Sequence, residues 1–419
     1  MTGNLEQLGQ AGRSGGRVGL VLSGGGARGA YELGVLSVLA PVLERRGERP
    51  RIIVGTSAGA LNAAYLAAGA DRGLVSVVDA GCRLWREIKY GDVLGPLLSE
   101  RELGLGVRLG LEFLGVRAGG VKSLLDNAPL ADTIRARVSF GKLAENVRSG
   151  VIDTAGVAAT SYQTGRSVVF HDGPASPPRD DKRAIDYVST RLAVVHVRAS
   201  AAIEVLFPAV EVTEPAGMGG WFGDGGTSLN TPLKPALAFG AERLIVIGLN
   251  SIASSSHPAA RRPADAFDGA AQVAQALLAD QLAGDVGTLA TINQIAAASG
   301  SAQGTRTAGQ RRVIPYIFVA PRERFAVGRL AGKVYRQRYA GLGGLRRAPS
   351  LALLGRALDP PRNPARGELF SYVFFAPEFA AALIEQGRRD AQWWLAQEHH
   401  DGPWRVGNPP AAHSDPALT

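Results

Sequence analysis

The sequence predicts an α/β fold with a mainly parallel central sheet, and three observations support this prediction. Short runs of β-branched and apolar residues alternate with longer stretches rich in alanine and leucine. The short runs show no polar alternation, which is typical of strands buried on both faces of a parallel sheet. Two of them end in glycine-rich turns that lead directly into a helical pattern, as expected of βα units. With 419 residues, of which 46% are hydrophobic and 20% charged, the chain can bury a large core.

The composition excludes several classes of protein. A single cysteine, Cys82, rules out an intramolecular disulfide framework, and no metal-ligand spacing occurs in the sequence. We therefore expect no metal, no cofactor and a reducing compartment. Residues 1–16 are polar and glycine-rich, without the apolar run of a signal peptide, and we expect them to be flexible. Because no apolar stretch reaches the roughly 20 residues of a membrane span, we expect a protein that is cytoplasmic or peripherally bound to a membrane.

The first strand is expected at Arg17–Leu22, and it runs into a glycine-rich loop, Ser23–Gly29. In this loop, Gly24, Gly26 and Gly29 match the pattern G-x-G-x-x-G. In a dinucleotide-binding fold the glycines would hold a pyrophosphate, and the next strand would end in an acidic residue. In a second interpretation the bare N–H groups of the loop stabilise an oxyanion.

The next expected strand, Arg51–Val54, ends in Gly55-Thr56-Ser57-Ala58-Gly59, and an alanine-rich helix follows. G-x-S-x-G between a strand and a helix is the pattern of a nucleophile elbow. Gly55 and Gly59 are expected where a Cβ would collide in the sharp turn, leaving Ser57 exposed at a helix N-terminus. This strand ends in the elbow and not in an acid, so the oxyanion interpretation explains both motifs. Arg28 would orient the loop or hold a phosphate, with a surface arginine in a turn as the alternative.

Further along the chain, the sequence predicts a helix over Gly73–Ile88 with Trp85 as a core anchor. The passage Gly95–Gly120 is interpreted as a candidate lid or lipid-contacting flap, with an ordinary packing insertion as the alternative. A buried strand is expected at Gly156–Ser161, with Ser167–Phe170 as its hairpin-like neighbour.

A third glycine-bounded motif, Asp224-Gly225-Gly226, stands where an apolar segment ends. Taken alone, such an acid is more typical of a turn in which the carboxylate bonds the backbone. A helix expected to open at Asn230 and a buried strand at Leu244–Gly248 place Asp224 on a loop of the sheet, where catalytic groups are found.

Beyond Asn250 the composition changes. We expect residues 251–395 to form a mostly helical extension that packs on the core. It contains a further strand at Val313–Val319 and an amphipathic helix at Phe370–Leu395. Residues 396–419 are expected to be a disordered tail.

The formal net charge of +9 is unevenly distributed, because from Arg306 to Arg366 only Glu323 and Asp359 are acidic. This stretch predicts peripheral contact with an anionic membrane surface, with a solvated arginine-rich face as the alternative. No nucleic-acid partner is expected, and the sequence does not define an oligomeric state.

Taken together, the three motifs at Ser23–Gly29, Gly55–Gly59 and Asp224–Gly226 resemble those of the patatin-like phospholipases. The resemblance covers about residues 17–250 and implies a three-layer α/β/α fold and an enzyme that acts on acyl esters of lipids. It implies Ser57 as the nucleophile and Asp224 as the base. The oxyanion hole that it implies comprises Gly24, Gly25, Gly26, Ala27, Arg28 and Gly29, and its motif glycines are Gly55, Gly59, Gly225 and Gly226.

The chemistry agrees with this resemblance, because an acyl ester needs a nucleophile, a proton acceptor and oxyanion donors, and each is supplied once. A carboxylate with a pKa of about 4 is a weak base at neutral pH, so we expect partial burial to raise the pKa of Asp224.

Two alternatives stay open. A histidine-dependent α/β-hydrolase needs a histidine after the acid in chain order. Four histidines follow Asp224 and lie in a polar linker or in the tail; these are His257, His399, His400 and His413. The other two, His171 and His196, precede Asp224. The second alternative is a non-catalytic module that binds phosphate or a nucleotide through the glycine loop, or a degenerate hydrolase with a regulatory role at membranes.

Overall fold

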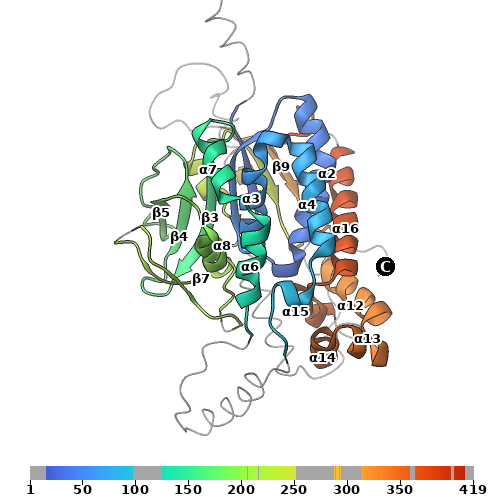
Figure 1. Cartoon of the computed structure of the whole chain (residues 1–419). Coiled ribbons are helices and arrows are strands. Elements are labelled where there is room, and N and C mark those ends of the chain that lie inside the picture. The colour runs from blue at the N-terminus through green and yellow to red at the C-terminus, as the bar shows by residue number, and fades with distance from the viewer. Residues whose placement is uncertain are drawn as a thin grey trace, which may run out of the picture.

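The computed structural model describes residues 16–97, 125–251, 313–358, 364–397 and 401–410, except 205 and 216, together with 287, 289–291 and 293. Its centre is a nine-stranded sheet covered by helices (Figure 1). The strands are β1 (Val18–Leu22), β2 (Pro50–Thr56), β3 (Thr154–Ser161), β4 (Ser167–Asp172), β5 (Ile185–Ser189), β6 (Val210–Val212), β7 (Gly220–Asp224), β8 (Arg243–Ile247) and β9 (Tyr316–Val319).

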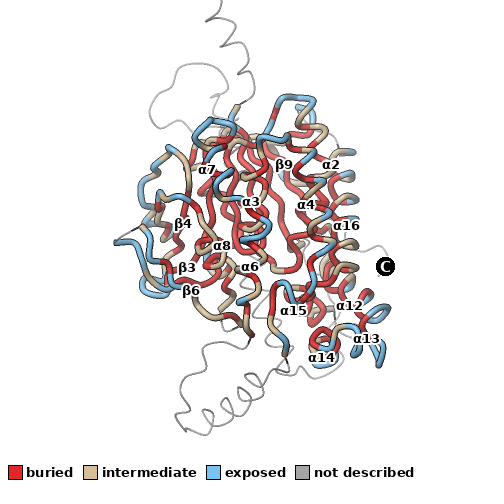
Figure 2. The backbone as a smooth tube through the Cα atoms, in the orientation of Figure 1, coloured by how far each residue is buried: buried red, intermediate tan, exposed pale blue. Residues whose placement is uncertain are grey.

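The sheet is mostly parallel, as the apolar runs predicted. Its order is β5-β4-β3-β2-β1-β8-β9, and β6 and β7 join it through β3. The pairs β1/β2, β2/β3, β1/β8, β8/β9 and β4/β5 are parallel, whereas β3/β4, β3/β7 and β6/β7 are antiparallel. The core strands β1 and β8 are almost wholly buried, as Figure 2 shows for the centre of the molecule.

The helices connect and cover these strands. They are α2 (Gly29–Arg45), α3 (Ala58–Ala68), α4 (Leu74–Glu87), α6 (Ala128–Arg137), α7 (Phe140–Arg148), α8 (Val194–Ser200), α9 (Gly226–Leu229), α10 (Leu233–Ala238), α12 (Ala326–Arg338), α13 (Gly341–Arg347), α14 (Pro349–Leu358), α15 (Pro364–Val373) and α16 (Pro377–Leu395). A Cβ on Gly55 of β2 would meet Gly59 of α3. The preceding residue Val54 pairs with Gly156, whose Cβ would lie 3.5 Å from Phe239 at the end of α10. Because successive residues of a strand face opposite sides, α3 and α10 cover opposite faces of the sheet. This arrangement gives the expected α/β/α layers.

The C-terminal region completes this core and is not a separate unit. Strand β9 adds to the sheet beside β8, and α16 packs along α2 (Figure 1). The single helix expected at Phe370–Leu395 is divided into α15 and α16, which meet at an angle of 114°. Pro377 explains the break, because the residue before a proline is disfavoured in helical conformation, whereas proline itself is favourable in the first turn of a helix.

The expectation of a disordered tail is wrong for residues 401–410. Trp404 is only 1% exposed, and its indole N–H donates to Glu48 Oε2 at 2.9 Å. Arg405 exchanges backbone hydrogen bonds with Tyr316 of β9. An aromatic side chain in a polar tail can bury a large apolar area, and this outweighs the composition on which the expectation rested.

Within the described part of the chain, no single helix has both the length and the apolar character to cross a bilayer. The bent pair α15 and α16 meets both conditions only when the two helices are taken together.

Candidate active site

Two strands meet end to end at the candidate site. Thr56, the last residue of β2, pairs with Ala158 of β3, and Asp224, the last residue of β7, pairs with the adjacent Ala159. Because β4 occupies the other edge of β3 over these residues, β2 and β7 must lie on the same side and run toward each other. The residues that follow Thr56 are therefore brought to Asp224, although 167 positions separate Ser57 from it.

The elbow at Ser57 has the strained geometry that its sequence predicts. Ser57 has φ 53° and ψ −119°, a conformation that L-residues seldom adopt. A Cβ on Gly55 would lie 2.1 Å from the carbonyl oxygen of Gly59, and one on Gly59 would lie 2.4 Å from that of Leu22. Neither position can therefore carry a side chain, and the tight turn depends on both glycines.

The Ser57 side chain lies close enough to the Asp224 carboxyl group to act as its hydrogen-bond partner and to lower its pKa. The backbone N–H of Ser57 donates to Ser200 Oγ at 2.8 Å, and Ser200 Oγ donates to the carbonyl oxygen of Ala158 at 2.5 Å. Ser200, at the end of α8, thus holds the strained elbow against β3. No sequence motif marks this hydrogen bond, because the residues around Ser200 are mostly small and apolar.

Asp224 lies in an environment that favours its neutral form. The pKa of Asp224 is raised to about 7, and burial is the largest cause. The nearby Glu204 carboxylate adds to the rise, whereas hydrogen bonding by Ser57 and by the N–H of Gly226 opposes it. The bond from the Gly226 N–H to Asp224 Oδ1 measures 2.6 Å. A carboxyl group with a pKa near 7 is matched to accepting a proton at neutral pH.

The six residues of the expected oxyanion hole differ in what their N–H groups do. The N–H of Gly24 donates to Asn230 O, that of Arg28 to Gly25 O, and that of Gly29 to Gly26 O. The N–H groups of Gly25, Gly26 and Ala27 have no acceptor among the residues that the structure describes. These three are the donors available to an oxyanion.

Arg28 is not a surface residue, and it is not free to hold a phosphate. It is 1% exposed and forms an ion pair of 2.6 Å with Glu368 of α15. It also donates to Ser371 Oγ at 2.7 Å and Asn250 Oδ1 at 2.8 Å, and its guanidinium lies 4.0 Å from the ring centroid of Tyr372. Of the two functional interpretations, the structure favours orientation of the loop.

The same helix contacts the loop directly. A Cβ on Gly26 would lie 2.2 Å from the carbonyl oxygen of Tyr372, and Gly26 has φ +57°. Gly26 therefore accommodates both the left-handed backbone and the close approach of α15. Neither Glu368 nor Tyr372 could be found from sequence, because no motif marks them.

A buried network of polar side chains joins α2, which follows the glycine loop, to the elbow helix α3 and to α4. Glu32 is fully buried and accepts from Asn62 Nδ2 at 2.8 Å, and Asn62 Oδ1 accepts from the indole of Trp85 at 2.9 Å. Burial raises the pKa of Glu32 well above its usual value. Trp85 is therefore the core anchor that the sequence predicted, and it also lines the cavity at Ser57.

A narrow apolar cavity of about 40 Å³ opens at Ser57. Gly26 of the glycine loop and Tyr372 of α15 lie on its wall, and the rest of the lining is almost wholly hydrophobic. No histidine lines this cavity within the described ranges. His171 and His196 are buried beside aromatic rings, and burial lowers the pKa of His171 to about 4. His257, His399, His400 and His413 lie outside the described residues, as does most of the candidate lid, Gly95–Gly120.

No cluster of His, Cys, Asp or Glu that could hold a metal occurs in the part of the chain that the structure describes. Cys82 is buried, and burial raises the pKa of its thiol to about 11.

Two comparisons with known proteins found a match. The family model "Patatin-like phospholipase" matches residues 20–237, which include all three motifs. Among solved structures, VipD from Legionella pneumophila is similar with 17% identity and a TM-score of 0.29, over 73% of this chain and 61% of VipD, so the chain spans less than two thirds of that protein. No curated protein matches. The family model covers more than half of the chain, and the protein therefore belongs to the patatin-like phospholipase family, a family of lipid acyl hydrolases.

Proposed function

We propose that the protein hydrolyses acyl esters of lipids through a Ser57–Asp224 dyad, as a phospholipase A or lysophospholipase. The observation that carries this proposal is the proximity of the Ser57 side chain to a buried carboxyl group whose pKa is near 7. Nucleophile and base must be within hydrogen-bond reach, and the base works best with a pKa near the operating pH.

The reaction would proceed in two halves. Ser57 Oγ attacks the ester carbonyl carbon while its proton passes to Asp224, and the N–H groups of Gly25, Gly26 and Ala27 stabilise the oxyanion. The carbon–oxygen bond to the alcohol then breaks, and the alcohol leaves with the proton from Asp224. Water attacks the acyl-enzyme, Asp224 accepts the water proton, and the fatty acid leaves as Ser57 recovers its hydrogen.

The alternatives have less support. A histidine-dependent triad would place a histidine against Ser57, whereas Asp224 already occupies that position. A phosphate-binding module would use Arg28 as an anion ligand, but this guanidinium is paired with Glu368.

The proposal is tested by fatty acid release from a lipid panel and by labelling with a fluorophosphonate probe. Ser57→Ala should lose both, and Asp224→Asn should lose hydrolysis, each by about a thousandfold or more, as removal of a nucleophile or base does. Ser149→Ala and the exposed Asp132→Asn are matched controls that should behave as wild type. Labelling that survives in Ser57→Ala, or full activity in Asp224→Asn, would contradict the dyad.

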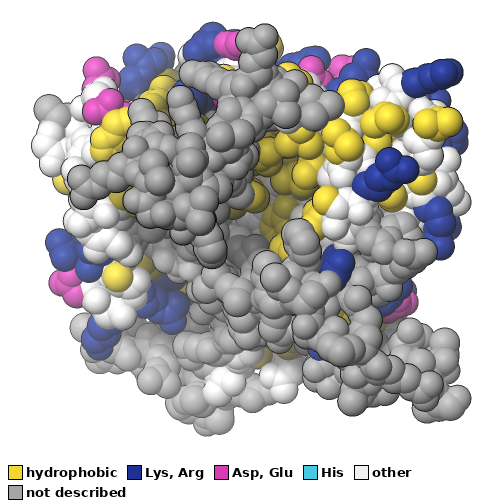
Figure 3. All heavy atoms as spheres, turned by 90° about the horizontal axis from the view of Figure 1, so that it is seen from below, with side chains coloured by type: hydrophobic (Ala, Val, Ile, Leu, Met, Phe, Trp, Pro, Cys, Tyr) yellow, Lys and Arg dark blue, Asp and Glu magenta, His cyan; other side chains and the backbone are white. Residues whose placement is uncertain are grey.

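We also propose that the protein meets anionic lipid through α12–α14. Of the predicted basic stretch, the structure describes residues 313–358 and 364–366. Helices α12–α14 carry seven basic residues and no acid; these are Arg329, Lys333, Arg336, Arg338, Arg346, Arg347 and Arg356. Leu342 is 79% exposed and Leu345 38% exposed on α13 between them. Figure 3 shows hydrophobic side chains beside Lys and Arg on the face to which these helices belong. Exposed apolar side chains with surrounding cations are typical of a surface that binds anionic lipid.

A further inference from the structure

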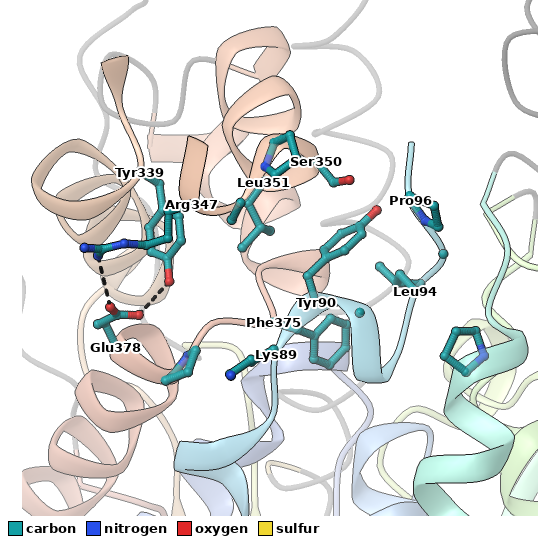
Figure 4. Close-up of a pocket in the computed structure, with 16 residues that line it drawn as sticks. Lys89, Tyr90, Leu94, Pro96, Tyr339, Arg347, Ser350, Leu351, Phe375 and Glu378 are labelled. Atoms are coloured by element: carbon teal, nitrogen blue, oxygen red, sulfur yellow. Dashed lines mark hydrogen bonds and ion pairs between the residues drawn. The ribbon is translucent and has the colours of Figure 1, made fainter. Parts of the chain in front are cut away.

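A second, larger cavity lies beside the candidate active site. It has a volume of about 600 Å³, within the range of small-molecule binding sites. One wall is formed by residues 89–96, which follow α4, and the opposite wall by the junction of α13 and α14 and the start of α16 (Figure 4). We call it the extension groove, because residues of the C-terminal region form half of it.

The extension groove adjoins the cavity at Ser57. Phe375, in the bend between α15 and α16, lines both. On the opposite side, Val93 lines the Ser57 cavity and its neighbour Leu94 lines the groove, and Leu130 and Pro129 of α6 divide in the same way. The two spaces therefore lie on either side of the Phe375 side chain. In each of the segments 93–94 and 129–130, one residue lines the Ser57 cavity and its neighbour lines the groove.

The wall of the groove is mainly apolar, because its polar groups bond to one another. Glu378 accepts from the Tyr339 hydroxyl at 2.6 Å and lies 3.8 Å from Arg347, as the dashed lines in Figure 4 show. Ser350 Oγ accepts from the N–H of Leu97 at 3.2 Å. What remains to meet a ligand is carbon surface from residues such as Leu94, Leu351 and Phe375, with Lys89 at one edge.

The volumes indicate how the two spaces would be used. The Ser57 cavity, at about 40 Å³, is far smaller than the roughly 300 Å³ at the lower end of small-molecule sites. A long hydrocarbon chain attached to an ester at Ser57 cannot end there and must continue into a larger apolar space. Burial of each methylene contributes about 0.8 kcal/mol, so such a space would favour long chains.

We propose that the extension groove binds the hydrocarbon chain of a long-chain acyl ester and so makes the enzyme selective for long-chain lipids. This inference rests on the proposed function for its substrate class. It assigns half of the specificity site to the C-terminal region, outside the residues that the family model matches.

The test uses Gly91, which lines the groove and at which an added Cβ meets no atom within 4 Å. Gly91→Trp therefore adds a large side chain at the wall of the groove without straining the backbone. Gly141→Trp, in α7, which lines neither cavity, is the matched control, because a Cβ there is equally free. We would measure kcat/KM for the p-nitrophenyl esters of butyrate and palmitate, and the affinity of each protein for the fluorescent long-chain fatty acid cis-parinarate.

The palmitate-to-butyrate ratio of kcat/KM should fall at least about tenfold in Gly91→Trp and stay at the wild-type value in Gly141→Trp. The affinity for cis-parinarate should fall by a similar factor, also in a Ser57→Ala background. Equal palmitate-to-butyrate ratios and equal affinities in the two variants would contradict the proposal that the groove binds the hydrocarbon chain. Loss of cis-parinarate binding in Gly91→Trp, from a wild type that hydrolyses neither ester, would support the groove and contradict the hydrolase. Hydrolysis of the esters without any binding of cis-parinarate would support the hydrolase and contradict the groove.

Discussion

Arg28 in the glycine loop and Glu368 in α15 form a buried ion pair of 2.6 Å across 340 positions of sequence. Glu368 Oε1 also accepts from the N–H of Gly328 at 2.7 Å, so the pair ties the loop to two C-terminal helices. Through this contact, the C-terminal region orients the N–H groups that we propose as oxyanion donors. The C-terminal region, which completes the core, would then also be required for catalysis.

The first prediction concerns this pair. Glu368→Gln leaves the Arg28 charge buried without its partner, which should lower the free energy of unfolding by about 3 kcal/mol. Because the loop shifts, kcat should fall about tenfold to hundredfold with little change in KM, as measured under conditions where the variant is folded.

A double variant separates positioning from stability. Arg28→Met combined with Glu368→Met removes both charges and should regain much of the lost stability without regaining kcat. The exposed Glu385→Gln is the control and should resemble wild type. Recovery of kcat in the double variant would show that Arg28 has only a structural role.

The second prediction is a pH profile. Asp224 must be deprotonated to accept the Ser57 proton, and burial raises its pKa to about 7. The value of kcat/KM should therefore rise about tenfold per pH unit at low pH and level off above about 7. Glu204→Gln removes a like charge and should move the midpoint to lower pH. A midpoint near 4 in the wild type would contradict the role of burial.

The third prediction concerns stability at high pH. The folded-state pKa of Asp224 is raised from 3.8 to about 7, so the folded protein binds this proton more tightly than the unfolded chain does. Its contribution to stability is fully present below about pH 4 and is lost as the pH rises through about 7. Asp224→Asn cannot ionise and should be more stable than wild type at pH 8, by up to about 4 kcal/mol.

At pH 4 the gain from Asp224→Asn should largely disappear, as thermal unfolding at the two pH values would show. The exposed Asp132→Asn should give no pH-dependent difference. The same result for both variants would mean that Asp224 ionises in the folded protein as readily as a surface carboxyl group.

The fourth prediction concerns lipid surfaces. Replacing Leu342 and Leu345 by Ser removes the exposed apolar side chains of α13 and should reduce pelleting with phosphatidylglycerol vesicles about tenfold. The wild type should pellet only weakly with phosphatidylcholine vesicles. Its pelleting with phosphatidylglycerol vesicles should weaken at high salt. Val151→Ser, which replaces an exposed apolar residue at 38% exposure, is the control. Binding that ignores lipid charge would contradict the proposed surface.

The fifth prediction concerns Trp404. Its side chain is 1% exposed and bonded to Glu48, so Trp404→Ala should lower the free energy of unfolding by about 3–5 kcal/mol. Trp221→Ala makes the same change at 49% exposure and should cost less than about 1 kcal/mol. Equal effects on urea unfolding would mean that residues 401–410 do not pack on the core in solution.

The sequence predicted the parts of the site whose residue types are set by local geometry. Gly55 is fixed by its contact with Gly59 within one turn, and Gly59 by the close approach of Leu22 of the neighbouring strand β1. The strand before the turn is marked by its apolar run. The packing of Trp404 escaped prediction because it depends on residues that are distant in the sequence. The break at Pro377 was missed although the proline marks it locally.

By itself, the sequence determined the α/β class, the elbow at Ser57 and the glycine loop, because each follows from local sterics and from the period of apolar residues. Only the three-dimensional arrangement shows which N–H groups of the loop are free, that Arg28 is held by Glu368, and that Phe375 lines both the Ser57 cavity and the extension groove. These relations connect residues hundreds of positions apart, and only the pairing of strands and the packing of helices bring them into contact.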